Sequence, residues 1–173
     1  MALVGVLVLS FGAWAVSPVK TLDIVDRDTH NLLLALPAAA GEPFTLTYLH
    51  SIARRPVEEV FYVSPEGQIL VDKTVWDMNG AGLPAGPEPG MQFELKDGQY
   101  ILTHMGRRYK EVVLAVGWVA QHKLVYRRRT LPLARLTPPG QAVRLLAGEH
   151  PRWFVLYEES RWLRLSEDTV DKG

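Results

Sequence analysis

The sequence of 173 residues contains no cysteine. This absence excludes disulfide bonds, thiolate metal sites and a cysteine nucleophile. The chain also lacks an excess of charge, because 19 basic and 19 acidic residues cancel to a formal net charge of zero. A neutral chain has no general attraction for nucleic acid or for anionic lipid, so we expect no nucleic-acid partner.

Signatures of nucleotide and metal binding are also missing. The Gly-x-Gly formed by Gly80 and Gly82 is not followed by the third glycine and helix of dinucleotide sites, nor by the Lys-Ser/Thr of a phosphate loop. The histidines do not have the spacing of a zinc site. They are His30, His50, His104, His122 and His150. We therefore predict no cofactor and no bound metal.

The N-terminus is an apolar run without charge. Residues 1–16 carry one polar side chain, Ser10, and Ala13-Trp14-Ala15 resembles a signal-peptidase site. The run reaches Val19, which is long enough for one tilted membrane span. A buried first strand or helix is the alternative. We expect residues 1–19 to be a signal peptide or membrane anchor, and the protein to be extracytoplasmic, in the periplasm or on the outer face of the cytoplasmic membrane.

Beyond Lys20, apolar and polar residues alternate with period two, which is typical of strands. The expected strands are residues 21–25, 31–36, 44–51, 57–63, 68–76, 91–95, 99–105, 111–119, 122–127 and 142–147. Pro65-Glu66-Gly67 and Lys96-Asp97-Gly98 are turn signals between them. The pattern predicts one all-β domain at residues 20–173, an antiparallel β-sandwich or a partly closed barrel.

The C-terminal segment at residues 153–165 fits either a hairpin or an amphipathic helix. Aromatic and β-branched residues fill both halves, which favours the hairpin. The polar tail at residues 165–173 is expected to fray.

The segment at residues 44–61 predicts a hairpin whose two strands bring polar groups together. Side chains alternate faces along a strand, so Tyr48 and His50 share a face. Matching the apolar faces of the two strands predicts the pairs Leu46–Val63, Tyr48–Phe61 and His50–Glu59. An imidazole would then lie beside a carboxylate at the end of a buried face.

Two further groups are expected beside that pair. Arg54 and Arg55 lie in the connection and would supply charge-assisted donors for a carboxylate or phosphate. A loop at residues 77–90 holds four glycines and three prolines, and its backbone N–H groups could face an anion. The predicted ligand-binding residues are His50, Arg54, Arg55, Glu59, Asn79, Gly80 and Gly82. The alternative is an architectural corner with a satisfied His50–Glu59 pair and solvated arginines.

An enzyme has weaker support. Ser51 adjoins His50, but adjacent strand residues point to opposite faces, so the imidazole cannot serve that hydroxyl as a base. The chain also has no G-x-S-x-G elbow. We predict no catalytic residue. A hydrolase or metal-dependent enzyme that uses His50 and Glu59 remains the alternative.

Three motifs carry a resemblance to a known family. They are Tyr48-x-His50-Ser51-Ile52, Pro56-Val57-Glu58-Glu59 and Gly80-Ala81-Gly82-Leu83-Pro84. Together they resemble domain-of-unknown-function family eighteen-fifty, over roughly residues 21–147. Members are often encoded beside the membrane subunits of TRAP transporters of the TAXI type. The resemblance provides no established activity and no established site residues.

The resemblance implies an extracytoplasmic accessory role near the uptake of organic anions. We therefore expect a non-enzymatic accessory protein of a TRAP-type solute transporter. Its partner would be a membrane subunit of the transporter, with a small organic anion as an expected ligand. Membrane contact would run through residues 1–19 if they are not cleaved. A pure structural or interaction module is a further alternative.

Overall fold

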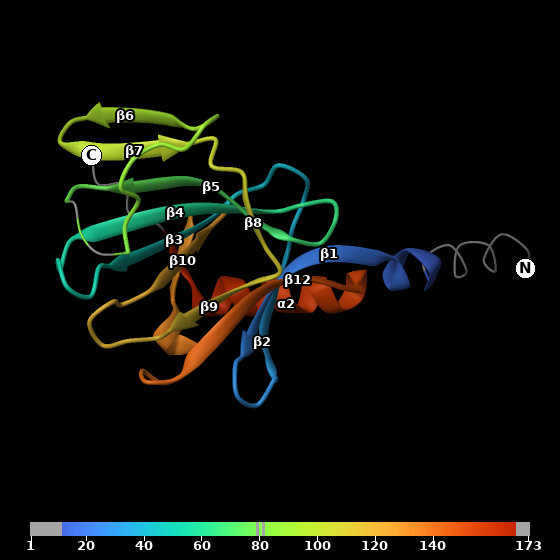
Figure 1. The fold of residues 1–173 in the computed structure, drawn as a ribbon. Coiled ribbons are helices and arrows are strands. Elements are labelled where there is room, and N and C mark those ends of the chain that lie inside the picture. The colour runs from blue at the N-terminus through green and yellow to red at the C-terminus, as the bar shows by residue number, and fades with distance from the viewer. Residues whose placement is uncertain (1–11, 79, 81, 169–173) are drawn as a thin grey trace, which may run out of the picture.

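The computed structural model describes residues 12–78, 80 and 82–168. Two antiparallel sheets pack face to face as a sandwich that does not close into a barrel (Figure 1). The predicted all-β class is therefore confirmed, in its sandwich form. The small sheet has the order β2-β1-β12-β9, and the large sheet has the order β13-β11-β10-β3-β4-β5-β7-β6, with β8 pairing to β5.

The described part of the chain contains these named strands and short helices: β1 (Pro18–Asp26), β2 (Leu32–Pro37), β3 (Phe44–Leu49), β4 (Pro56–Val63), β5 (Ile69–Trp76), β6 (Gln92–Lys96), β7 (Gln99–Thr103), β8 (Arg107–Tyr109), β9 (Glu111–Ala115), β10 (Lys123–Tyr126), β11 (Arg129–Pro132), η1 (Leu133–Arg135), β12 (Ala142–Pro151), α2 (Arg152–Leu165) and β13 (Glu167–Asp168). The ten expected strands are all present. The short strands β8, β11 and β13 were not expected, because two to four residues rich in charge show no alternation of their own.

The core lies between the two sheets and follows from the alternation of side chains along each strand. The small sheet contributes Leu22, Ile24 and Leu145, and the large sheet contributes Phe44, Leu46, Phe61, Ile69 and Leu124, all of them buried. Burying one such side chain stabilises the fold by roughly 1.5–3 kcal/mol. The opposite face of the large sheet carries polar residues such as Thr47 and Glu58 together with apolar residues such as Val75 and Ile101.

The C-terminal segment is the helix α2, so the predicted hairpin is wrong. Val155, Glu158 and Trp162 are its buried residues, at the three- and four-residue spacing of a helix face. The Glu158 carboxylate accepts a hydrogen bond of 3.2 Å from the Ala35 N–H on the edge strand β2. The Trp162 ring meets the ring of Tyr126 edge-on at 5.9 Å. These tertiary contacts favour the helix over the local preference for strand.

The N-terminal region joins the fold earlier than the expected boundary at residue 20. Residues 12–16 are helical, and β1 begins at Pro18, so Pro18 and Val19 pair with Pro151 and His150. Residues 1–11 lie outside the described residues. Within the described part of the chain, no helix has the length and apolarity needed to cross a membrane.

The tail is partly described. Glu167 and Asp168 form β13 against β11, and the Arg129 guanidinium pairs with the Asp168 carboxylate at 2.7 Å. Residues 169–173 lie outside the described residues, so the expected fraying is not tested there.

Candidate functional site

The predicted hairpin of β3 and β4 exists, but its register differs from the expected one. Leu46 lies opposite Glu59 and Tyr48 lies opposite Val57, so each partner on β4 comes four residues earlier than predicted. A connection of six residues joins the strands, and it is too long to impose a tight-turn register. An even shift leaves the faces unchanged, and the inward side of the hairpin was therefore predicted correctly.

The expected pairing of His50 with Glu59 is consequently wrong. His50 lies in the connection beyond the ladder, where its N–H donates to the Arg55 carbonyl at 2.8 Å. The imidazole is buried, and its Nδ1 accepts a hydrogen bond of 3.1 Å from the Ala53 N–H. Gly80 lies against the ring, because a Cβ placed there would be 3.7 Å from His50 Cε1. His50 therefore organises the hairpin corner and its contact with the loop at residues 77–90, which we call the glycine loop.

The two arginines of the connection have different surroundings. Arg55 Nε donates to Asp77 Oδ1 at 3.1 Å, and Arg55 Nη2 pairs with Asp77 Oδ2. This fork ties the hairpin connection to the start of the glycine loop and occupies the donors that were expected to meet an anion. Arg54 is exposed and adopts a positive φ of 56°. Gly82 is exposed with a φ of 86°, and Asn79 lies outside the described residues.

Glu59 is separated from these groups and faces the space between the sheets. It lines a cavity of about 270 Å³ together with Phe61, Met105 and Arg107. Burial raises the pKa of the Glu59 carboxyl above its usual range. Burial also raises the pKa of the Tyr48 hydroxyl, and the charge of Glu59 adds to that effect. The structure therefore brings His50, Arg55 and Gly80 to one corner and leaves Glu59 inside the sandwich.

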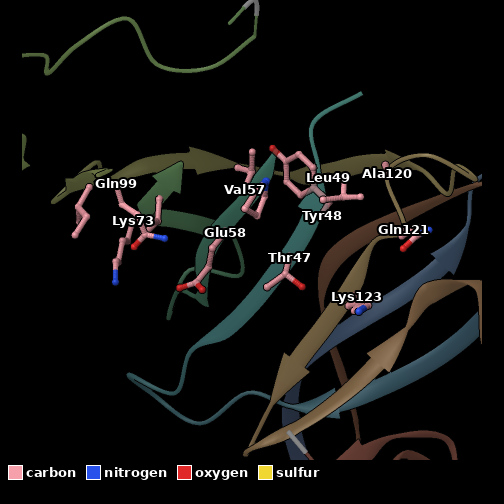
Figure 2. Close-up of a pocket in the computed structure, with 13 residues that line it drawn as sticks. Thr47, Tyr48, Leu49, Val57, Glu58, Lys73, Gln99, Ala120, Gln121 and Lys123 are labelled. Carbon is pink, nitrogen blue, oxygen red and sulfur yellow. The ribbon is translucent and has the colours of Figure 1, made fainter. Parts of the chain in front are cut away.

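A larger concave site lies on the outer face of the large sheet, with a cavity of about 500 Å³ (Figure 2). The strand register places Lys123 of β10 opposite Thr47 of β3, and Thr47 opposite Glu58 of β4. Lys73 of β5 lies on the far side of Glu58, as Figure 2 shows. We call this site the sheet groove and define it by Thr47, Glu58, Lys73, Gln99, Gln121 and Lys123.

The sheet groove contains two lysines and one glutamate. Among the described residues, neither Lys73 nor Lys123 takes part in an ion pair within 4 Å. Neighbouring strands are about 4.8 Å apart, so the Cα atoms of Lys123 and Glu58 are separated by about 10 Å. Two ammonium groups thus flank one carboxylate. The hydroxyl of Thr47 and the amide of Gln121 add both donors and acceptors.

Sequence reasoning missed the sheet groove. Each of its residues is a polar side chain on an outward-facing position, which by itself indicates only a solvated surface. The alternation in β3 and β4 could have placed Thr47 and Glu58 on the outer face. Their combination with Lys73 and Lys123 depends on the order of four strands, which no local pattern encodes.

The described residues do not assemble a metal centre, since they contain no group of three or more His, Asp or Glu side chains able to hold an ion. Ser51 lies next to His50 in the connection, where the His50 Nδ1 already accepts the N–H of Ala53. The Nδ1 atom of His50 is therefore engaged with the backbone.

Comparison with known proteins assigns the chain to a family. The family model described as "Domain of unknown function (DUF1850)" matches residues 44–133, slightly more than half of the chain. No curated protein and no solved structure gives a match. The matched region runs from the start of β3 through β11 and holds the hairpin, the glycine loop and the sheet groove. The chain therefore belongs to the DUF1850 family.

Proposed function

We propose that the protein is a non-enzymatic, extracytoplasmic binding protein that holds a small organic anion in the sheet groove. The observation that carries the proposal is the presence of Lys73 and Lys123 in one concave site without ion-pair partners among the described residues. Ammonium groups in a concave site raise the local concentration of anions and form charge-assisted hydrogen bonds with carboxylates.

The lining of the groove limits the chemistry of the ligand. Its volume of about 500 Å³ falls in the range of small-molecule sites. Val75 and Ile101 provide apolar surface beside the polar row, which suits a short carbon skeleton. Two lysines against one glutamate leave the groove with a formal charge of +1. We therefore propose a small carboxylic acid whose carboxylate meets a lysine and whose hydroxyl or amino group meets Glu58.

We further propose that the protein acts as an accessory to a TRAP-type solute transporter. The uncharged apolar run at residues 1–16 supports export or membrane anchoring. The family resemblance supports a place beside a TRAP membrane subunit. An anion-binding groove suits such a role, because the protein would meet the anion before or after the membrane subunit does.

The ligand proposal is tested by calorimetric titration of small mono- and dicarboxylic acids into the full chain and into Lys123→Gln. Losing one charge-assisted hydrogen bond costs about 1.5–3 kcal/mol, which weakens binding by about 10- to 150-fold. Lys110→Gln is the matched control, because Lys110 is an exposed lysine outside the groove. Failure of every acid to bind at millimolar concentration, or equal affinities of the two variants, would refute the proposal.

An interaction module is a second candidate, and the edge strand β6 favours it. β6 is the last strand of the large sheet and pairs only with β7 in the described structure. All its residues are exposed, including Phe93 and Leu95, the latter at 63%. An exposed edge of this kind can accept a strand from a partner. Purification from native membranes decides this case, since Leu95→Lys should release a transporter subunit that Lys110→Gln retains.

A further inference from the structure

One side of α2 is an exposed apolar surface. Trp153, Leu156, Tyr157 and Leu163 are between 48% and 57% exposed. At 100° per residue they lie on one face of the helix, opposite the buried Val155, Glu158 and Trp162. Large apolar side chains gathered on one helix face indicate a surface that contacts something other than water.

This surface continues into the N-terminal segment. The Arg152 guanidinium lies 5.3 Å from the centre of the Trp14 ring, and the Arg152 N–H donates to the Ser17 carbonyl at 3.0 Å. Trp14 and Val16 are themselves exposed. Figure 1 shows that the N-terminal segment leaves the sandwich beside the start of α2. We call the joint surface the aromatic patch; its members are Trp14, Val16, Trp153, Leu156, Tyr157 and Leu163.

Two arginines, Arg152 and Arg164, border the patch. Arg164 donates to the Ser160 hydroxyl at 3.2 Å. The carboxylates of α2 are turned to other partners: Glu158 pairs with Arg161 at 2.9 Å, and Glu159 pairs with Arg127 at 2.6 Å. Within the described part of the chain, neither Arg152 nor Arg164 forms an ion pair. Arginines beside tryptophan and tyrosine are typical of a surface that lies in the headgroup region of a bilayer.

The sequence next to the patch also supports a lipid bilayer as the partner of this surface. Residues 1–11 contain no charged side chain and lead directly into the helical residues 12–16. A membrane-embedded segment at that position would hold the patch close to the bilayer surface. Tryptophan and tyrosine rings place an apolar body among acyl chains and a polar end in water, and arginines pair with anionic headgroups.

We infer that the aromatic patch rests on a lipid bilayer that contains anionic lipids, and that it sets the orientation of the sandwich on the membrane. α2 packs against the small sheet, whereas the groove lies on the outer face of the large sheet, so the groove stays open to solvent. The inference rests on the proposed membrane location and is independent of what the groove binds.

The absence of cysteine makes a direct test available, because one introduced cysteine can carry a spin label. The full chain with Tyr157→Cys is reconstituted into vesicles of phosphatidylcholine and phosphatidylglycerol. Access of oxygen and of a water-soluble nickel complex to the label is then measured. The label at residue 157 should favour oxygen, as membrane-immersed sites do. A label at Gln121→Cys, in the groove, should favour the nickel complex.

A second variant distinguishes membrane contact through the aromatic patch from membrane attachment through the N-terminal segment. Trp153→Glu should move the label at residue 157 toward the aqueous value while the protein still floats with the vesicles. Trp118→Glu is the matched control, since Trp118 is 76% exposed and lies outside the patch. It should leave the label unchanged.

Three outcomes would overturn the inference. A protein that floats with vesicles while the label at residue 157 stays aqueous refutes the patch and leaves the anchor intact. Spin–spin broadening between labels would assign the surface to a second copy of the chain. A full chain that does not float refutes the patch and the proposed membrane anchor together, and leaves a cleaved and exported protein as the remaining form of the location proposal.

Discussion

Gly148 lies directly against the side chain of Asp23, and alanine at this position is expected to destabilise the fold. Gly148 pairs with Thr21 across the ladder of β12 and β1. A Cβ on Gly148 would lie 2.1 Å from Asp23 Oδ2, 2.5 Å from its Cγ and 2.7 Å from its Oδ1. Contacts this close require the carboxylate to move.

Asp23 cannot move without losing its partners. Asp23 is only 6% exposed. Its Oδ1 accepts the Thr21 hydroxyl at 2.6 Å, and its Oδ2 pairs with His150 Nε2 at 2.8 Å. Hydrogen bonds to a charged group contribute about 1.5–3 kcal/mol each, so both together contribute about 3–6 kcal/mol. Alanine recovers about 0.5–1 kcal/mol relative to glycine within a strand.

The net expectation for Gly148→Ala is a loss of about 2–5 kcal/mol in the free energy of unfolding. For a domain of this size, a loss of 1 kcal/mol lowers Tm by about 2–4 °C, so the expected fall is about 4–20 °C. Gly86→Ala is the control. A Cβ there meets no atom within 4 Å, and the backbone does not have a positive φ. Its Tm should change by no more than a few degrees.

Thermal and urea unfolding of both variants, repeated in an Asp23→Ala background, completes the test. Asp23→Ala removes the three atoms nearest to the methyl group of Gly148→Ala, so the second substitution should cost much less in that background than in the wild type. Equal stabilities of Gly148→Ala and Gly86→Ala would refute the steric argument. An unchanged cost in the Asp23→Ala background would show that the clash lies elsewhere.

Two further predictions concern the half-buried Glu59 and the buried Glu158. Burial raises the pKa of the Glu59 carboxyl in the folded protein. As the pH rises through the ordinary value of 4.5, this carboxyl therefore ionises in the unfolded chain before it ionises in the folded protein. The free energy of unfolding falls with rising pH until the pH has passed the folded pKa. Glu59→Gln should therefore be more stable than wild type at pH 7, and the difference should vanish toward pH 4; a gain independent of pH would contradict the assignment. Glu158→Ala should cost about 2–4 kcal/mol in urea unfolding, because it removes the acceptor of the Ala35 N–H and the partner of Arg161. Glu158→Gln keeps a hydrogen-bond acceptor and should lower the free energy of unfolding by less. A loss below about 0.5 kcal/mol in Glu158→Ala would contradict the conclusion that Glu158 holds α2 against the small sheet.

The architecture could be predicted from local pattern where that pattern is strong. All ten expected strands appear in the structure, because alternation over five or more residues reports a strand with one buried face. The C-terminal segment shows where composition misleads. Its tryptophans, phenylalanine and valine fit a strand locally, yet Val155, Glu158 and Trp162 find buried partners only when the segment is helical. Propensity differs by tenths of a kcal/mol per residue, whereas burial contributes several kcal/mol.

The candidate site shows more clearly what the sequence determines and what the tertiary structure decides. By itself the sequence determined that residues 44–61 form a hairpin and which of its faces points inward, since the period of two is intrinsic to a strand. Tertiary structure decided the register, because the six-residue connection does not impose one. It thereby moved Glu59 away from His50 and paired Arg55 with Asp77. It alone decided that Lys73, Glu58, Thr47 and Lys123 share a groove, because strands distant in sequence become neighbours only through the order of the sheet.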